Sequence, residues 1–473
     1  MCCALLNRLL LVSCLLPLCL TPLSMRAVPQ KRHVDLLVVG GIVVTMDAER
    51  RVIENGTLAI RGDTIVAIGP RADLEGRFIS SRRLDATGKL VLPGLINGHT
   101  HAPMTLLRGL ADDASLHDWL NNYIFPAEAR NVTPDFVAWG TRLADLEMMH
   151  SGVTTYADMY YFEDDIARET KAAGMRGVLA ETIIGFPAPD NKDFAHALAY
   201  TEKFLNHWKG DPLIHAAVGP HSVYTCSKDL LAESAELARR YHAPILIHLS
   251  ESKPEVDESR AKYGVSPAAY LDELGFLGAD VLAAHCIWVD RHDVALLVRR
   301  DVGCVHNPSS NILLASGVAP VTQMITAGVR LGLGTDGSAG DNHDLDLMEE
   351  MPRAAELQKV THRDPQALLA EQAFAMATID GARALHMEDQ VGSLEPGKKA
   401  DLVLLNLTTP DGVPLYNVYS QIVYSLKARD VETVVIGGRM IMENRRILTI
   451  DEAEVLHKAR EYGDRVRKSL DLH

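Results

Sequence analysis

Eight short apolar runs alternate with helical segments through the middle of the chain, and this alternation most constrains the fold. The runs are rich in Val, Ile, Leu and Ala and end in Gly, Pro or polar residues, which is typical of strands buried on both faces. Strands that alternate with helices predict a parallel sheet, and eight such units predict a closed (β/α)8 barrel, an α/β fold. The runs read VLPGLINGHTH, GVTTYADMY, RGVLAETIIG, IHAAVGPHS, PILIHLSE, VLAAHCIWV, VGCVHNPSS and RLGLGTDGS.

The carboxyl ends of four of these runs carry side chains that commonly bind metal ions. In a barrel, the loops at these ends build the active site, so we expect these side chains to converge. Two histidines separated by one residue of a strand point the same way, so the opening His-Thr-His directs two imidazoles to one point. A lone His-x-His is more often structural, but the joint pattern favours a metal centre. The residues are His99 and His101, then His248 and Glu251, then His285, and finally Asp336.

The predicted barrel spans residues 91–388, and the segments on either side of it have a different sequence pattern. Residues 28–90 and 389–473 contain short strand-like runs separated by Gly, Asn and Asp turns, and the second segment ends in a predicted helix. With 473 residues, 47% of them hydrophobic, the chain is long enough for the barrel and a smaller domain. The formal net charge of -15, without any basic run, argues against a nucleic-acid partner.

The first 27 residues, MCCALLNRLLLVSCLLPLCLTPLSMRA, contain arginines but no acidic residue around a leucine-rich middle. Because that middle is short and interrupted by Pro17, it predicts a cleaved export signal rather than a membrane span. The run LVSC also resembles a lipoprotein cleavage box, in which case a lipid on Cys14 would anchor the protein. We therefore expect a secreted or periplasmic protein that meets the membrane only if it is lipidated. The three later cysteines are too widely spaced for a disulfide framework and are expected to be buried: Cys226, Cys286 and Cys304.

Six stretches make the chain resemble the amidohydrolase superfamily: GHTHAPMTLLRG, GPHSVYTCS, HLSE, AAHC, HNPSSN and GTDGS. Within the superfamily, the chain resembles the group that contains methylthioadenosine/S-adenosylhomocysteine deaminases. The resemblance covers nearly everything beyond the leader. It implies that the two flanking segments join in one small β-sandwich beside the barrel.

The resemblance implies a single divalent metal ion as the cofactor. His99, His101, His248 and Asp336 would be its ligands, a set that suits zinc, with iron as the alternative. Some members of the superfamily hold two metals bridged by a carboxylated lysine on the fourth strand. The fourth run here, IHAAVGPHS, contains no lysine, so one metal is expected.

The resemblance also implies three catalytic roles. Asp336 would take a proton from the attacking water. Glu251 would protonate the ring nitrogen next to the attacked carbon and then help to protonate the departing amine. His285 would orient the water and polarise the oxygen that develops in the transition state. Glu255, four residues beyond Glu251, is expected to be a solvated carboxylate on a loop.

Three further residues match substrate contacts of this group. Glu128 in IFPAEA resembles the carboxylate that binds the ribose hydroxyls, and His221 in GPHS resembles an imidazole that reaches the substrate. Trp119 in LHDWL is expected to form an apolar wall against the ligand, or else to be an ordinary packing aromatic.

Glu181 is a departure from the family pattern. In relatives that accept S-adenosylhomocysteine, arginines from the third strand and the loop after it can hold the carboxylate of the amino acid. Here the third run offers Glu181, and the following loop has Lys192 but no arginine. A carboxylate facing the substrate predicts a preference for neutral nucleosides such as adenosine or methylthioadenosine. The alternative is that Glu181 pairs with a nearby base such as Arg176 and never meets the ligand.

Together these residues predict a metal-dependent aminohydrolase that releases ammonia from the exocyclic amine of a purine nucleoside. One alternative is the same chemistry on another heterocycle, such as guanine, a pterin or an s-triazine, where chloride could also leave. An alternative from a different class is a metal-free binding protein on the same fold. The sequence leaves the oligomeric state open, a homo-oligomer included.

Overall fold

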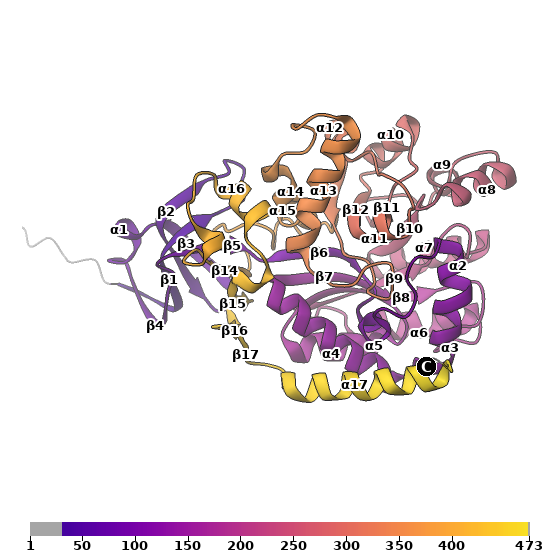
Figure 1. Cartoon of the computed structure of the whole chain (residues 1–473), viewed down its shortest axis with the longest axis horizontal. Coiled ribbons are helices and arrows are strands. Elements are labelled where there is room, and N and C mark those ends of the chain that lie inside the picture. Colours follow the sequence, from indigo (N-terminus) through magenta and orange to yellow (C-terminus); the bar gives the residue numbers. More distant parts are fainter. Residues whose placement is uncertain (1–30, 472–473) are drawn as a thin grey trace, which may run out of the picture.

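The computed structural model describes residues 31–471 and contains eight parallel strands arranged as a barrel (Figure 1). Strands that follow one another along the chain are neighbours in the barrel. Thr100, at the end of the first strand, pairs in parallel with Asp336, just beyond the last, so the two ends of the sheet meet. The predicted barrel is therefore confirmed. Its strands are β6 (Leu95–Thr100), β7 (Val153–Tyr160), β8 (Arg176–Ile183), β9 (Ile214–Pro220), β10 (Ile245–Leu249), β11 (Val281–His285), β12 (Gly303–His306) and β13 (Arg330–Leu333).

Side chains of each barrel strand alternate between the inside of the barrel and the layer beneath the helices. In β8, Val178 and Ala180 belong to the inner apolar cluster. Leu179 and Ile183 belong to the larger cluster that includes the surrounding helices. Because both faces are buried, the strands read in the sequence as continuous apolar runs.

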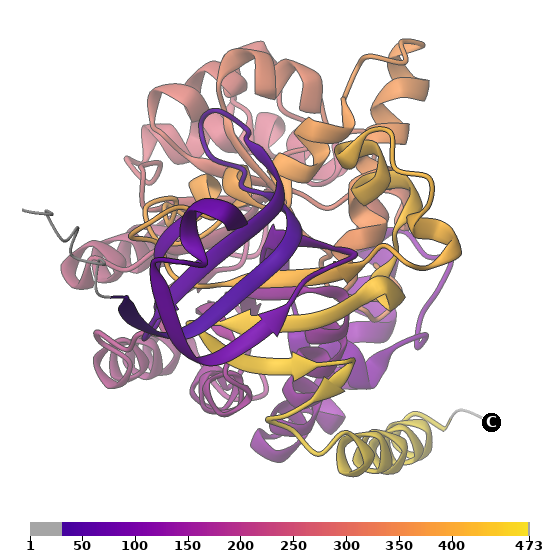
Figure 2. The same ribbon diagram turned by 90° about the vertical axis from the view of Figure 1, so that its left-hand side faces the viewer.

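Helices surround the barrel strands (Figures 1 and 2). Local signals set their ends: the Thr133 hydroxyl accepts the backbone N–H of Phe136 at 3.2 Å to begin α4, and Gly152 ends that helix with φ of 89°. The helices of the barrel are α4 (Pro134–Ser151), α5 (Glu163–Ala173), α6 (Phe194–His207), α7 (Lys228–Tyr241), α8 (Lys253–Tyr263), α9 (Pro267–Glu273), α10 (Arg291–Arg299), α11 (Pro308–Leu313), α12 (Val321–Ala327), α13 (Leu347–His362), α14 (Ala370–Met376) and α15 (Ile379–Ala384).

The long connection from β6 to α4 is built from short helical turns. It contains Trp119 and Glu128, which are predicted to contact the substrate, so its course matters for the site. Its elements are η1 (Ala102–Leu107), α2 (Leu116–Asp118), η2 (Trp119–Ile124) and α3 (Phe125–Asn131).

Strands from both flanking segments join in one nine-stranded sheet, as expected of a second domain shared by the two flanks. The sheet folds back on itself, so that its edge strand β3 approaches the segment before β14. Ile65 N–H in β3 donates to the Lys398 carbonyl at 2.9 Å. The strands are β1 (Arg32–Val44), β2 (Val52–Arg61), β3 (Thr64–Pro70), β4 (Phe78–Asp85), β5 (Lys89–Pro93), β14 (Leu402–Asn406), β15 (Val431–Ile436), β16 (Arg439–Glu443) and β17 (Arg446–Ile447); the short helices are α1 (Arg71–Leu74), η3 (Pro410–Gly412), α16 (Val418–Ser420), η4 (Gln421–Ser425) and η5 (Ala428–Asp430).

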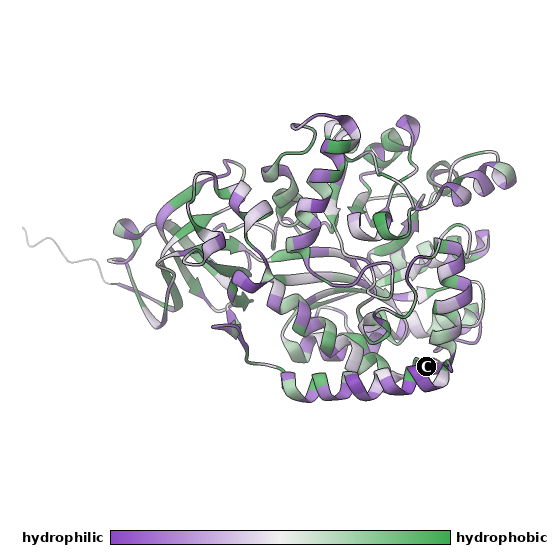
Figure 3. Cartoon of the chain, viewed as in Figure 1, coloured by the Kyte–Doolittle hydropathy of each residue, from purple (hydrophilic) through white to green (hydrophobic). Residues whose placement is uncertain are grey.

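Two contacts tie this sheet and the chain end to the barrel. The guanidinium of Arg176, at the start of β8, forms a buried ion pair with Asp401 at 2.9 Å, next to β14. The last helix, α17 (Glu452–Ser469), runs along α4, where the rings of Tyr462 and Phe136 meet edge to face with centroids 5.6 Å apart. The helix carries both hydrophobic and hydrophilic residues (Figure 3).

Within residues 31–471, no helix has the length and the apolar composition needed to cross a membrane. The expectation of buried cysteines is confirmed, because Cys226, Cys286 and Cys304 are buried and free. The predicted leader, with Cys14, lies outside the described residues.

Candidate active site

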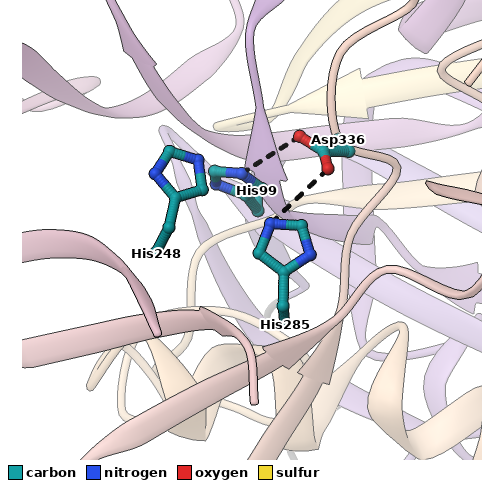
Figure 4. A group of neighbouring side chains, drawn as sticks. All are labelled: His99, His248, His285 and Asp336. Atoms are coloured by element: carbon teal, nitrogen blue, oxygen red, sulfur yellow. Dashed lines mark ion pairs between the residues drawn. The ribbon is translucent and has the colours of Figure 1, made fainter. Parts of the chain in front are cut away.

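Four side chains at the carboxyl ends of the barrel strands lie close enough together to hold one metal ion (Figure 4). One potential ligand atom of each lies within 4.8 Å of those of the others. His99 Nε2 is 3.2 Å from Asp336 Oδ1, and His285 Nε2 is 3.6 Å from Asp336 Oδ2. The group consists of His99 from β6, His248 from β10, His285 from β11 and Asp336 from the loop after β13.

His101 adds a fifth donor beside this group. It directly follows β6, and its Nε2 lies 3.3 Å from Asp336 Oδ1 and 3.3 Å from His248 Nε2. The structure thus brings the four predicted ligands together and places His285 next to them. Because His101 and His285 contact the same carboxylate, the assignment of the first as a ligand and the second as a catalytic group stays a prediction.

The chemistry of these donors fits a zinc ion. His99 Nε2 is buried, and apart from its contact with Asp336 it meets no hydrogen-bond partner among residues 31–471. Burial lowers the pKa of His99 to about 4 and that of His248 well below its usual value, which favours the neutral imidazole that binds metals. Nδ1 of His101 lies 2.5 Å from the Met159 carbonyl oxygen, and Nδ1 of His248 lies 2.9 Å from that of His221. Each carbonyl oxygen accepts a hydrogen bond from Nδ1–H, so Nε2 carries no proton and is free to bind a metal.

Glu251, just beyond β10, reaches the same group of side chains. Its Oε2 lies 3.8 Å from His285 Nε2. Burial, with the nearby charges of Asp336 and Asp341, raises the pKa of Glu251 well above its usual range. This shift favours a protonated carboxyl at neutral pH, which is the form that a general acid needs.

Glu255 is not a solvated loop carboxylate, so that expectation is wrong. It lies in the first turn of α8 and is buried. Its two oxygens accept the backbone N–H groups of Ser250 at 3.0 Å and Glu251 at 2.7 Å. Glu255 therefore holds the backbone of the loop that carries Glu251. Sequence reasoning overlooked it because its position in the loop suggested exposure.

Glu128 and His221, predicted to bind the substrate, both line the pocket that most of the metal-binding side chains also line. Glu128 lies on α3 and accepts a hydrogen bond from the Tyr160 hydroxyl at 2.8 Å. Burial raises the pKa of Glu128 to about 7. His221 follows β9, and its Nδ1 lies 3.0 Å from Thr225 Oγ1.

An apolar wall completes this pocket, with Trp119, Leu120, Phe125 and Leu314 among its members. The indole N–H of Trp119 donates to the Ala339 carbonyl at 2.9 Å. Trp119 is only 5% exposed, so it packs in the core and also lines the pocket. Among the described residues that line the pocket, none is Lys or Arg.

Sequence reasoning missed two polar residues of the site. Asp341 lines the pocket and accepts the backbone N–H of Ala339 at 3.0 Å, and burial raises its pKa to about 7. Asn311 Oδ1 lies 3.2 Å from His285 Nδ1. A signal for each was present, because Asp341 follows Asp336 in GTDGSAGD and Asn311 ends the stretch HNPSSN.

Glu181 does not face the pocket, so the expectation that it faces the substrate is wrong. Its neighbour Thr182 lines the pocket, and alternation along β8 turns Glu181 to the other face of the strand. There it accepts the backbone N–H of Glu163 at 3.1 Å. The alternative is right that Glu181 lies away from the pocket, but Arg176 is not its partner, because Arg176 pairs with Asp401.

Residues 90–441 match the amidohydrolase family. A protein named 5-methylthioadenosine/S-adenosylhomocysteine deaminase 1, from Syntrophus aciditrophicus, is 48% identical over 440 residues, which are 93% of this chain and 99% of that protein.

Among solved structures, an adenosine deaminase from Xanthomonas campestris with bound zinc superimposes with a TM-score of 0.91 at 38% identity, over 93% of this chain and 100% of that one. An atrazine chlorohydrolase from Arthrobacter aurescens, in complex with zinc, shares the fold with a TM-score of 0.83 at 23% identity, over 90% of this chain and 100% of that one. The family match spans most of the chain, and the long alignment at 48% identity agrees with it. This chain therefore belongs to the amidohydrolase family.

Proposed function

We propose that this protein is a metal-dependent aminohydrolase that replaces the exocyclic amine of an adenine nucleoside with oxygen and releases ammonia. The observation that carries the proposal is the convergence of Glu251, His285 and Asp336 on one group of metal-binding side chains. Relatives of similar length that are named as deaminases of adenine nucleosides support the substrate class.

The metal site is assigned to His99, His101, His248 and Asp336, whose nitrogen and oxygen donors suit zinc. A zinc ion with an open coordination position lowers the pKa of water, so that a nucleophile is available near neutral pH. The remaining steps are assigned to side chains of the chain itself.

Three side chains manage the protons of the reaction. Asp336 accepts the proton of the attacking water, and His285 Nε2, 3.6 Å from Asp336 Oδ2, orients that water. Glu251 donates its proton to the ring nitrogen beside the attacked carbon, and the proton that Asp336 took from the water then protonates the departing amine. The Glu251 carboxylate assists this step by taking the proton of the newly added hydroxyl, which becomes the carbonyl of the product. Glu128, oriented by Tyr160, accepts hydrogen bonds from the ribose hydroxyls.

The pocket also supports a preference for neutral nucleosides, although not through Glu181. Four carboxyl groups line the pocket, those of Glu128, Glu251, Asp336 and Asp341, while no described lining residue is Lys or Arg. The carboxylate of S-adenosylhomocysteine would therefore lack a cationic partner there. We infer that adenosine or methylthioadenosine is the better substrate.

Deamination of a panel of compounds tests the proposal. Purified protein, with zinc content measured, is assayed with adenosine, methylthioadenosine, S-adenosylhomocysteine, guanine, a pterin and a chlorinated s-triazine. Absorbance and ammonia release report deamination, and chloride release reports dehalogenation. Activity on the adenine nucleosides supports the proposal. Turnover confined to another heterocycle would replace it with the alternative chemistry, and protein without bound metal would favour a binding role.

A further inference from the structure

Several buried carboxyl groups lie behind the metal-binding residues and take no part in the reaction described above. Asp158 ends β7, Glu163 begins α5 and Asp145 lies within α4, and all three are fully buried. Such groups are costly to bury unless each finds partners, so their contacts indicate their roles. Only Asp158 contacts the segment that carries His99 and His101.

One oxygen of Asp158 binds the residues directly before and after His101. Its Oδ1 accepts the Thr100 hydroxyl at 2.6 Å and the backbone N–H of Ala102 at 2.6 Å. Thr100 and Asp158 are also partners in the register of β6 and β7. With the Met159 carbonyl 2.5 Å from His101 Nδ1, the end of β7 fixes both the backbone and the ring of this histidine.

The second oxygen of Asp158 faces another acid. Neither Asp158 Oδ2 nor Glu163 Oε2 meets an N–H or other protein donor within the described part of the chain, and both atoms are buried. The two carboxyl groups lie next to each other, and two buried carboxylates would repel, so a stable contact between them needs one shared proton. Burial and the charge of Asp158 raise the pKa of Glu163 well above its usual range, so Glu163 is the acid that carries this proton.

Two hydrogen bonds hold Glu163 itself in place. Its Oε1 accepts the backbone N–H of Tyr160 at 3.0 Å, and its own N–H donates to Glu181 at 3.1 Å. Asn191 donates to the other oxygen of Glu181 at 3.0 Å. The residue before Glu163, Phe162, has φ of 57°, a left-handed conformation that begins α5 at this point.

We propose that Asp158 and Glu163 form a carboxyl pair that positions His99 and His101 to bind the metal. Glu163 donates its proton to Asp158 Oδ2, which leaves Asp158 Oδ1 as a charged acceptor for Thr100 and Ala102. Both acids are positioning residues, since neither reaches the metal-binding group or the pocket. The inference rests on the metal site of the proposed function but not on its substrate.

Zinc affinity of apoprotein, measured by competition with a chelator and without substrate, tests this pair. Glu163→Leu removes the proton donor and should weaken zinc binding by about tenfold or more. Glu163→Gln should stay within about twofold of the unmodified protein, because its amide N–H can still donate to Asp158. Asp145→Asn is the matched control, since Asp145 is equally buried but does not contact residues 99–102, and its zinc affinity should not change.

Thr100→Val gives a second variant of nearly unchanged shape. It removes one of the two donors to Asp158 Oδ1 and should weaken zinc binding several-fold. This variant tests the positioning role of Asp158 even if Glu163→Leu does not fold. The proposal is overturned if Thr100→Val binds zinc as the unmodified protein does, or if Glu163→Gln and Glu163→Leu lose affinity equally. Failure of the unmodified protein to bind zinc would instead contradict the proposed function.

Discussion

Replacing Glu251 by Gln separates proton transfer from metal binding. Glu251 is only 4% exposed, and its Oε2 lies 3.8 Å from His285 Nε2, so a side chain of the same size leaves the surrounding group intact. The amide of Gln can donate a hydrogen bond but cannot transfer its proton to a ring nitrogen. Loss of a general acid costs about 10²-fold or more in rate, which corresponds to about 2.7 kcal/mol or more in the activation free energy.

The assay combines metal analysis with steady-state kinetics on adenosine. The zinc content of Glu251→Gln should equal that of the unmodified protein, while kcat and kcat/KM fall together, because the proton moves only in the transition state. Glu258→Gln makes the same change on an exposed residue of α8 and should leave both quantities unaltered. A Glu251→Gln variant with normal turnover would refute the assignment of Glu251 as the proton donor, and one that loses zinc would show that Glu251 also holds the metal.

Four further predictions concern the metal ligands, the substrate preference, the N-terminus and the buried ion pair. Replacing His99 or Asp336 by Ala should remove zinc and abolish turnover together, and full activity of metal-free protein would contradict the site. S-adenosylhomocysteine should show a several-fold lower kcat/KM than adenosine, a difference of about 1 kcal/mol, and equal use would refute the preference. Protein from its native host should begin near residue 28 and lie outside the cytoplasm, which intact-mass measurement of fractionated cells would test. A diacylglycerol mass on Cys14 would favour the lipoprotein, and an uncleaved cytoplasmic chain would refute both the export signal and the lipoprotein. Arg176→Met should lower the free energy of unfolding in denaturant by about 3–5 kcal/mol, because it leaves Asp401 buried without its cation, and a loss below about 1 kcal/mol would refute this.

Much of the site could be predicted because it depends on local pattern and on one general rule of the fold. Each strand appears in the sequence as a short apolar run, and the residue after such a run lies at the carboxyl end of the barrel. His99, His248, His285 and Asp336 were therefore expected to meet, although they are separated by up to 237 residues, and the structure places them together. Only the residue types at strand ends were needed for that expectation.

The predictions from the sequence were wrong where the role of a residue depends on the direction of a single buried side chain. Glu181 lies one position from Thr182 on the same strand, yet alternation sends the first away from the pocket and the second into it. The sequence suggests that Glu255 is a solvated acid. In the structure, the first turn of α8 places its carboxylate within hydrogen-bond distance of the backbone N–H groups of Ser250 and Glu251.

The sequence by itself thus determined the barrel, the second domain built from both flanks and the chemistry of the metal-binding group. These follow from apolar periodicity and from residue types at strand ends, which are properties of short segments. Only the tertiary structure showed which buried acids support the metal-binding segment from outside the pocket, such as Asp158 and Glu163. The contacts of Asp158 with Thr100 and Ala102 join residues 56 to 58 positions apart through hydrogen bonds of single atoms. Such contacts depend on side-chain direction and burial, which no local pattern records.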